Sequence, residues 1–286
     1  MSFTDYQRKL LITIISSLIY GIILLFVGLI ISFFFYYFGT ASPVLNKLQG
    51  FLPPGEYQAI ALQYGFDAPF CVQLYKYIFD FFIGNWGESF VIAPNKASID
   101  LMREILPRTI GILLVPLLIG LIGIKLGKIL VKKRNKAQGF IIRIYIVIGL
   151  STPIFFLATL IQFCGIIPGF SLPLLGMADY DYYPIPIITG SPLFDSVISG
   201  DWKLAGSLIE YSILPIFILS FMILAIVIKQ TQNYIERKTE ETAFVSNTLT
   251  AGKLFGIIFA LVITLEICFN RTGFGYYFIS SIFTGD

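Results

Sequence analysis

A basic segment between two long apolar runs constrains the fold of this chain more than any other feature. Residues 125–143 contain seven Lys and Arg side chains and no acid. The flanking apolar runs, 105–131 and 140–163, each reach the roughly 20 residues that a helix needs to cross a lipid bilayer. A short basic loop between two spans faces the cytoplasm, because Lys and Arg resist translocation. The sequence therefore predicts a membrane protein oriented by this loop.

The composition agrees with a membrane protein and removes several kinds of chemistry. The chain is 56% hydrophobic and 13% charged, whereas soluble domains average about 25% charged residues. It has no His, the commonest acid–base side chain and metal ligand. Its three cysteines lack the CxxC spacing of metal and redox motifs. The net charge of +3 is too small to indicate a nucleic-acid partner. We expect no metal site and no nucleotide-binding site on this chain.

The pattern of apolar runs predicts an all-α integral membrane protein with a single transmembrane domain over residues 1–286. Five spans are predicted, at 10–38, 105–131, 140–163, 213–228 and 248–269. The cations near the start hold the N-terminus inside, which places the C-terminus outside. Residues 39–104 and 165–211 are then large outer loops with short amphipathic helices, predicted at 70–83 and 196–202. The apolar tail 276–283 is too short to span and predicts a surface helix.

Two features of the spans indicate how they pack. Gly111, Gly120, Gly123 and Gly127 give the second span a flank of small residues, where another helix can approach closely. Ser151-Thr152-Pro153 breaks the middle of the third span, because proline cannot donate the helical hydrogen bond. The carbonyl that this frees must be satisfied by Ser or Thr hydroxyls or by a neighbouring helix. The break is either a packing kink or a bend that lines a path through the membrane.

Glu266 is an ionisable residue inside a predicted span, which is a functional hypothesis by default. It lies near the outer end of the fifth span, where we expect it to reach water. Two interpretations stay open: a structural bond to a neighbouring loop, or a gate at the outer mouth of a path. A membrane enzyme would need a nucleophile–base pair or a metal set, and neither accompanies Glu266 or Glu210.

Several ordered motifs resemble one family of membrane proteins. They are Gly65-Phe66-Asp67-Ala68-Pro69, Gln73, Gly84-Asn85-Trp86-Gly87-Glu88-Ser89, Leu106-Pro107-Arg108-Thr109, Leu150-Ser151-Thr152-Pro153-Ile154-Phe155-Phe156, Gly200-Asp201-Trp202, Leu214-Pro215 and Gly273-Phe274-Gly275. In this order they resemble the permease subunits of the oligopeptide/dipeptide/nickel family of binding-protein-dependent ABC importers. The resemblance covers the chain from about Leu10 onward.

The resemblance implies a transport subunit of a prokaryotic plasma membrane and not an enzyme. Its partners would be a second homologous permease, two ATPases that bind ATP and Mg, and an external substrate-binding lipoprotein. It implies that the translocation path or its gate uses Ser151, Thr152, Pro153, Gln162 and Glu266. Coupling to an ATPase would use Glu236, Arg237, Lys238, Glu240 and Glu241, and the binding protein would dock near Asp67, Glu88, Asp179, Asp181 and Asp201.

Two departures from the family pattern leave a second hypothesis open. The cytoplasmic loop between the fourth and fifth spans is shorter than in the family, and no sixth span follows Gly273-Phe274-Gly275. The family's coupling helix lies in that loop. The alternative function is therefore a transport-inactive, permease-like scaffold or sensor that docks a binding protein or a peptide signal. Co-purification of an ATPase would distinguish the two hypotheses.

Overall fold

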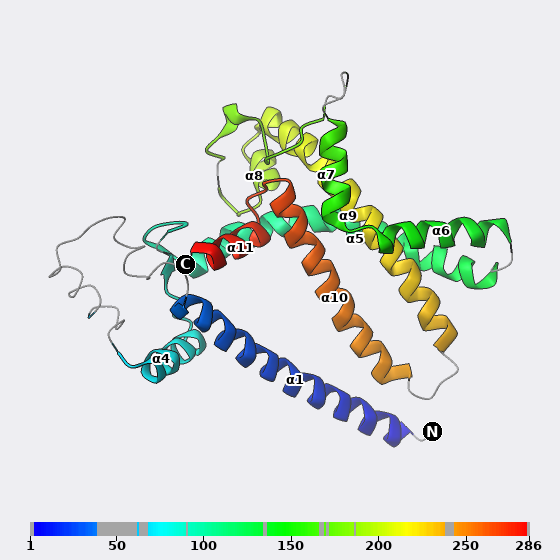
Figure 1. Cartoon of the computed structure of the whole chain (residues 1–286), viewed down its shortest axis with the longest axis horizontal. Coiled ribbons are helices and arrows are strands. Elements are labelled where there is room, and N and C mark those ends of the chain that lie inside the picture. Colours follow the sequence, from blue (N-terminus) through cyan, green and yellow to red (C-terminus); the bar gives the residue numbers. More distant parts are fainter. Residues whose placement is uncertain are drawn as a thin grey trace. The chain divides into compact units, whose positions relative to one another are not determined.

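The computed structural model describes residues 3–38, 62, 68–89, 91–133, 136–165, 169, 172–185, 187–237 and 243–284. These residues form the helices α1 (Phe3–Phe38), α4 (Phe70–Phe82), α5 (Ser98–Lys132), α6 (Ala137–Ser151), α7 (Ile154–Cys164), α8 (Pro192–Ile198), α9 (Trp202–Arg237), α10 (Ala243–Cys268) and α11 (Phe274–Thr284) (Figure 1). A 3-10 helix, η1 (Tyr180–Tyr182), and two short strands, β1 (Glu88–Ser89) and β2 (Lys96–Ala97), complete the described part. The prediction of an all-α protein is confirmed.

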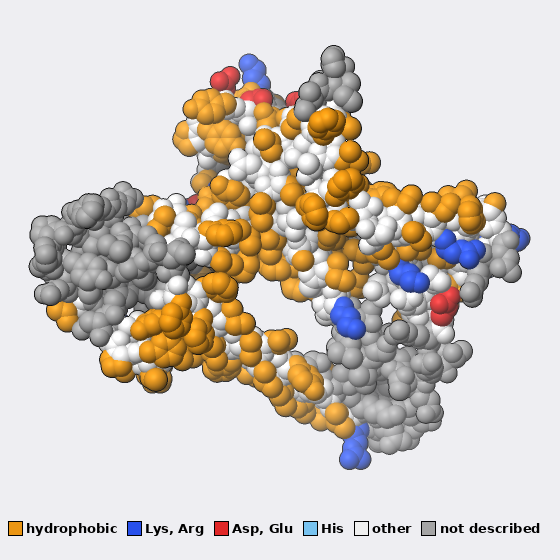
Figure 2. Space-filling model, viewed as in Figure 1, with side chains coloured by type: hydrophobic (Ala, Val, Ile, Leu, Met, Phe, Trp, Pro, Cys, Tyr) orange, Lys and Arg blue, Asp and Glu red, His pale blue; other side chains and the backbone are white. Residues whose placement is uncertain are grey.

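Three helices in the described part of the chain are long and apolar enough to cross a membrane, at Ile14–Phe35, Ser98–Lys132 and Trp202–Glu236. The pair α6 and α7 makes a fourth if it is counted as one broken span. Hydrophobic side chains cover much of the visible surface (Figure 2), and large ones are exposed along α1 and α6. These features fit an integral membrane protein. The fifth span, on α10, and the orientation stay predictions.

The chain divides into two compact units, which are described separately: Met1–Leu101 with Phe278–Asp286, and Met102–Tyr277. In the first unit, α4 packs on α1 through aromatic rings. The Phe33 side chain is fully buried, and its ring lies 5.4 Å from that of Phe70 and 5.5 Å from that of Tyr77. The hydroxyls of Ser32 and Tyr77 are 3.0 Å apart. The predicted amphipathic helix at 70–83 is thus confirmed as α4.

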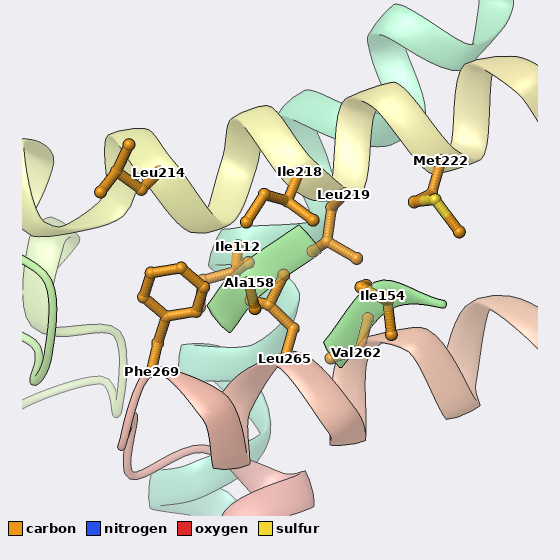
Figure 3. Packing of buried hydrophobic residues seen from close by; sticks show 10 residues of the cluster. All are labelled: Ile112, Ile154, Ala158, Leu214, Ile218, Leu219, Met222, Val262, Leu265 and Phe269. Atoms are coloured by element: carbon orange, nitrogen blue, oxygen red, sulfur yellow. The ribbon is translucent and has the colours of Figure 1, made fainter. Parts of the chain in front are cut away.

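The second unit has a hydrophobic core where four helices meet (Figure 3). Helix α9 contributes the largest share, four of the ten buried residues, and these pack with residues of α5, α7 and α10. Because lipid tails are as apolar as these side chains, close van der Waals packing stabilises the contact between helices that lie in a membrane. The ten buried core residues are Ile112, Ile154, Ala158, Leu214, Ile218, Leu219, Met222, Val262, Leu265 and Phe269.

Glycines on α5 let α9 approach closely, as the sequence predicted. A Cβ atom at Gly123 would lie 3.0 Å from the Cβ of Val227, and one at Gly127 would lie 2.6 Å from the Cβ of Thr231. A Cβ atom at Gly120 would lie 3.0 Å from the Cγ2 of Ile223. The prediction holds for these three glycines but not for Gly111, where a Cβ would have nothing within 4 Å. Helices α5 and α9 therefore form a close-packed pair.

The predicted third span is broken at Ser151-Thr152-Pro153, and α6 and α7 are bent by 94° relative to each other. The hydroxyl of Ser151 donates to the carbonyl of Val147 at 2.6 Å, and that of Thr152 donates to Ile148 at 2.8 Å. Pro153 then caps the start of α7. These are the carbonyls of Val147 and Ile148, whereas the carbonyl that Pro153 frees is that of Gly149, four residues earlier. The expectation that a hydroxyl or a neighbouring helix satisfies that carbonyl stays a prediction.

Several element bounds differ from the predicted ones. Helix α9 begins at Trp202, well before the apolar run at 213–228, and α5 begins at Ser98. The first turns of α9 carry polar residues, so a prediction based on apolar runs does not include them. Asp201 caps α9, since its Oδ1 accepts from the backbone N–H of Leu204 at 3.0 Å. The short amphipathic helix predicted at 196–202 is instead α8, Pro192–Ile198, because Gly200 turns the chain with a φ of +74°.

Asp195 fixes the loop that precedes α8. Its side chain is 2% exposed and accepts hydrogen bonds from the backbone N–H groups of Ile188 at 3.0 Å and Thr189 at 2.9 Å. The next residue, Gly190, has a φ of +86°, and a Cβ there would lie 2.5 Å from the carbonyl oxygen of Arg103 on α5. Asp195 therefore holds this loop against the start of α5.

The stability contributed by Asp195 is expected to depend on pH. Burial raises the pKa of its carboxyl, but hydrogen bonds from Thr189, Ile188 and Gly190 outweigh burial and lower the pKa below its usual range. A carboxyl whose pKa is lower in the folded state stabilises the protein above its unfolded pKa of about 3.9. That contribution is lost as the pH falls through the folded pKa.

We expect Asp195→Asn to lower the free energy of unfolding by about 1–2 kcal/mol at pH 7, because charged hydrogen bonds are replaced by weaker ones. Below pH 4 the difference in the free energy of unfolding between the variant and the wild type should become smaller. Thermal unfolding in detergent between pH 3 and pH 7 measures both effects. A difference that is constant over this range would contradict the role of the ionised carboxylate.

Candidate functional site

Buried polar side chains gather where α10 ends and where α5 enters its apolar run. Glu266 is 0% exposed, Arg271 is 4% exposed and Thr109 is 6% exposed. Burying such groups is unfavourable unless each has hydrogen-bonding partners. We call this cluster the polar junction and define it as Arg108, Thr109, Glu266 and residues 271–276. It lies within the unit Met102–Tyr277.

Glu266 links α10 to α5 and to the start of α11. Its Oε1 accepts from the hydroxyl of Thr109 at 2.6 Å. Its Oε2 accepts from the backbone N–H groups of Gly275 at 2.6 Å and Tyr276 at 3.3 Å. The hydroxyl oxygen of Thr109 in turn accepts from the backbone N–H of Phe274 at 2.7 Å. One carboxylate thus fixes three segments, and it satisfies N–H groups in the first turn of α11 that have no helical partner.

Two arginines hold the turn that follows α10. Arg271 donates to the carbonyl of Tyr211 at 3.0 Å and to the hydroxyl of Ser212 at 3.2 Å, both on α9. Arg108 on α5 donates to the carbonyl and hydroxyl oxygens of Thr272 at 3.1 and 3.2 Å. Burial lowers the pKa of Arg271 to about 10, and the nearby Glu266 charge opposes that shift. Arg271 therefore stays protonated at neutral pH.

The polar junction brings together two motifs that are far apart in the sequence. Leu106-Pro107-Arg108-Thr109 supplies the side chains from α5, and Gly273-Phe274-Gly275 supplies backbone groups. Neither glycine has room for a side chain: a Cβ at Gly273 would lie 2.5 Å from the Cδ of Glu266, and one at Gly275 would lie 2.5 Å from the Cα of Ile263. The spacing of the Gly-x-Gly turn therefore follows from its contact with Glu266.

Of the residues predicted for the path or gate, the structure brings Gln162 close to Glu266. The amide of Gln162 on α7 donates to the carbonyl of Cys268 at 2.8 Å, two residues from Glu266. Ser151-Thr152-Pro153 lies at the opposite end of α7 and does not join this cluster. The expectation that Glu266 reaches water is wrong for this chain, because bonds to Thr109 and the following turn enclose its carboxylate. Its role in a gate stays a prediction.

The predicted coupling residues are described only in part. Glu236 is exposed near the end of α9 and accepts from the amide of Gln232 at 3.0 Å. Arg237 is the last residue of α9, and its side chain is outside the described part. Lys238, Glu240 and Glu241 lie outside the described residues altogether.

The predicted docking acids have structural partners of their own. Asp179 accepts from the hydroxyls of Ser207 at 3.0 Å and Tyr211 at 2.9 Å, which fasten its loop to α9. Asp201 caps α9, and Asp181 is exposed in η1. These three lie in one unit, whereas Glu88 lies in β1 of the other. Asp67 is outside the described residues.

Sequence reasoning missed Thr109, Arg108 and Arg271 as parts of a site. In the sequence, Arg108 and Thr109 stand out only as members of the motif Leu106-Pro107-Arg108-Thr109, and Arg271 belongs to none of the motifs. The signal that could have found them is the position of the cations: Arg108 lies near the start of the predicted span 105–131, and Arg271 follows the predicted span 248–269, which contains Glu266. An acid buried within a span requires donors or a cation nearby.

Comparison with known proteins supports the resemblance, although no family model matches the chain. The chain is 32% identical over 180 residues to the probable D,D-dipeptide transport system permease protein DdpB of Escherichia coli (strain K12). This match covers 61% of the chain and 51% of the relative. The dipeptide transport system permease protein DppB of Lactococcus lactis subsp. cremoris is 28% identical over 174 residues, covering 59% of the chain and 55% of the relative.

A further relative bears a different substrate in its name. The putrescine export system permease protein SapB of Escherichia coli (strain K12) is 27% identical over 209 residues, covering 63% of the chain and 64% of the relative. The chain spans about half the length of the dipeptide permeases it matches. The resemblance to permease subunits of peptide transport systems, drawn from the motifs, is confirmed by these matches.

Proposed function

We propose that this chain is a membrane-spanning permease subunit of an ABC transporter that imports peptides or a related small solute. It forms the translocation path together with a second permease. Separate ATPases bind ATP and Mg and drive the cycle, and an external binding lipoprotein delivers the solute. The complex lies in the plasma membrane of a prokaryote, with the five spans and the orientation predicted above. The chain itself moves solute and carries out no chemistry.

The observation that carries this proposal is the similarity to permeases named for dipeptide transport. The polar junction adds support, because it joins two of the motifs on which the resemblance rests and gives each a physical role. The alternative function, a transport-inactive scaffold or sensor, is not favoured, since the relatives are named as transport or export permeases.

The site assignments within this proposal follow the predictions from the sequence. Gln162, Glu266 and the break at Ser151-Thr152-Pro153 border the path. The segment from Glu236 to Glu241 contacts an ATPase, and the acids Asp67, Glu88, Asp179, Asp181 and Asp201 lie toward the binding protein. Alternating access in such proteins arises from rigid-body movement of helices around a central path.

Reconstitution of the chain with the proteins that co-purify with it tests the function. We expect an ATPase among those proteins and ATP-dependent uptake of a radiolabelled dipeptide into proteoliposomes. Putrescine, offered in the same assay, distinguishes a peptide substrate from a polyamine. Vesicles without ATP and vesicles that lack this chain are the controls. Stable isolation without any ATPase, together with no ATP-dependent transport, would favour the scaffold.

Labelling of single cysteines tests the orientation. In a background without Cys71, Cys164 and Cys268, we expect Lys203→Cys to react with an impermeant maleimide in intact cells. Lys132→Cys should react only after the membrane is opened. Both side chains are exposed, and the basic loop that includes Lys132 is predicted to be cytoplasmic. Reaction of Lys132→Cys in intact cells would contradict the predicted topology.

A further inference from the structure

Helix α10 is held very differently along its length. At the end near Glu266, the side chains of Val262, Leu265 and Phe269 are each no more than 1% exposed and belong to the core. From Gly252 to Ile257, by contrast, five of the six residues are exposed. A Cβ at Gly252 or Gly256 would have nothing within 4 Å. Among the described side chains, α10 is therefore embedded in its unit at the Glu266 end and mostly exposed at residues 252–257.

Hydrogen bonds add to this difference. Near its end α10 is bonded to α5 through Glu266 and Thr109 at 2.6 Å, and to α7 through the carbonyl of Cys268 and Gln162 at 2.8 Å. The carbonyl of Phe269 also accepts from the backbone N–H of Gly176 at 2.8 Å. These directional bonds fix both the position and the rotation of the helix end. Its movement there requires breaking several buried hydrogen bonds.

The neighbouring helix α9 stays buried over a longer stretch. Ile223, Ala225 and Ile228 are 0% exposed, and among the described residues of its second half exposed side chains such as Tyr234 appear only nearer its end. Close contacts with glycines on α5 and with Gly149 on α6, where a Cβ would lie 2.5 Å from the Cβ of Ala225, hold it there. Helices α5, α6 and α9 thus form one packed body, whereas residues 252–257 of α10 are mostly exposed in the described part of the chain.

We propose that α10 pivots at the polar junction, so that residues 252–257 move relative to the packed body of α5, α6 and α9 while the Glu266 end stays fixed. Segments with few buried contacts are those that move at low free energy. Glu266 and Gly252 are separated by about 21 Å along the helix at 1.5 Å per residue. A rotation of about 10° at Glu266 therefore displaces Gly252 by about 4 Å.

The pivot also links the predicted ATPase-coupling segment with the predicted translocation path. In the sequence, the predicted coupling residues from Glu236 to Glu241 precede α10, and Gln162 lies beside the fixed end of α10. That the movement transmits ATPase closure to the path rests on the proposed function. The inferred movement does not depend on that function, because it is inferred from the difference in packing between residues 252–257 and the Glu266 end of α10.

Distances between paired spin labels test the proposal in the full-length chain in lipid nanodiscs. With the native cysteines replaced, one pair is placed at Phe255 and Tyr234, and a matched pair at Ile267 and Ile213. All four side chains are exposed, and each pair joins α10 to α9. We expect a distance distribution roughly twofold wider for the Phe255–Tyr234 pair than for the Ile267–Ile213 pair. Equal widths would overturn the proposal.

A substitution at Thr109 tests whether the polar junction is the pivot. Thr109→Val removes the hydroxyl that bonds Glu266 and Phe274, and we expect it to widen the Ile267–Ile213 distribution. Thr109→Ser keeps the hydroxyl and should leave that distribution unchanged. Folding of both variants is checked by size-exclusion chromatography. If folded Thr109→Val leaves the distribution unchanged, the junction is not the pivot and the proposal fails.

The same labels separate this proposal from the proposed function. In a complex with its ATPases, trapping of the ATP-bound state should shift the Phe255–Tyr234 distance and leave the Ile267–Ile213 distance unchanged. A wide Phe255–Tyr234 distribution that does not respond to ATP would support the pivot and contradict coupled transport. A shift in the Ile267–Ile213 distance of the same size would contradict the pivot.

Discussion

Gly275→Ala is expected to destabilise the protein by about 2–3 kcal/mol, as overpacking of a buried site does. The new Cβ would lie 2.5 Å from the Cα of Ile263 and 3.0 Å from the Oε2 of Glu266. The first of these is backbone of α10 and cannot rotate away. To relieve the contact, α11 must shift, and the hydrogen bond from the Gly275 N–H to Glu266 then lengthens. Chemical unfolding in detergent measures the change.

Gly256→Ala is the matched control on α10. A Cβ there meets nothing within 4 Å, so only the helix propensity changes. Alanine is favoured over glycine in a helix by about 1 kcal/mol. We therefore expect Gly256→Ala to be neutral or slightly stabilising. If both alanine variants had the same stability, the close approach of α11 to α10 would be refuted.

Glu266→Ala is expected to lower the free energy of unfolding by about 3–5 kcal/mol, because it leaves several buried donors without an acceptor. These are the hydroxyl of Thr109 and the backbone N–H groups of Gly275 and Tyr276. The buried Arg271 also loses a nearby negative charge. Thermal stability and the yield of folded protein in detergent measure the loss.

Glu266→Gln distinguishes a structural role from a role in a gate. Its amide keeps one acceptor oxygen, so we expect a loss of only about 1 kcal/mol. If Glu266 is structural, transport should fall in proportion to the amount of assembled protein. If transport falls while assembly and stability stay close to wild type, the carboxylate takes part in the gate. A Gln variant as unstable as the Ala variant would show that the charge itself holds the junction.

The features that the sequence predicted well depend on residues close together in the chain. The apolar runs located α5 and α9, the glycines at 120, 123 and 127 indicated a close contact, and Ser151-Thr152-Pro153 marked the break between α6 and α7. Each follows from a local rule about helix length, side-chain size or a missing N–H group. Element bounds were less accurate where the first turns of a helix carry polar residues, as in α9.

The polar junction could not be predicted, because its members come from distant segments. Thr109 and Glu266 are separated by 157 positions, yet their oxygens lie 2.6 Å apart. Local patterns placed Glu266 near a helix end and suggested water as its partner. The structure gives it a threonine hydroxyl and two backbone N–H groups instead, since the turn after α10 folds back over the carboxylate. The identity of such hydrogen-bonding partners depends on tertiary packing, which the local patterns of one sequence do not reveal.

The 94° bend between α6 and α7 has a consequence for how these helices lie in a bilayer. Their 15 and 11 residues measure about 22 and 16 Å along the axes. If both halves tilt equally, each makes about 47° with the membrane normal, and together they cover about 27 Å of a hydrocarbon core about 30 Å thick. Moderately unequal tilts give nearly the same crossing, whereas a strongly unequal tilt leaves one half nearly parallel to the membrane and shortens it.

Such a tilt is more than twice the average of about 20° for membrane helices. Lipid alone does not favour it, so the neighbours must impose it, and α9 contacts both halves. The thickness that this part of the chain presents to the bilayer is therefore adjustable through the angle at Thr152 and Pro153. A bilayer that is a few ångström thinner or thicker would change that angle before it changes the unbroken helices α5 and α9.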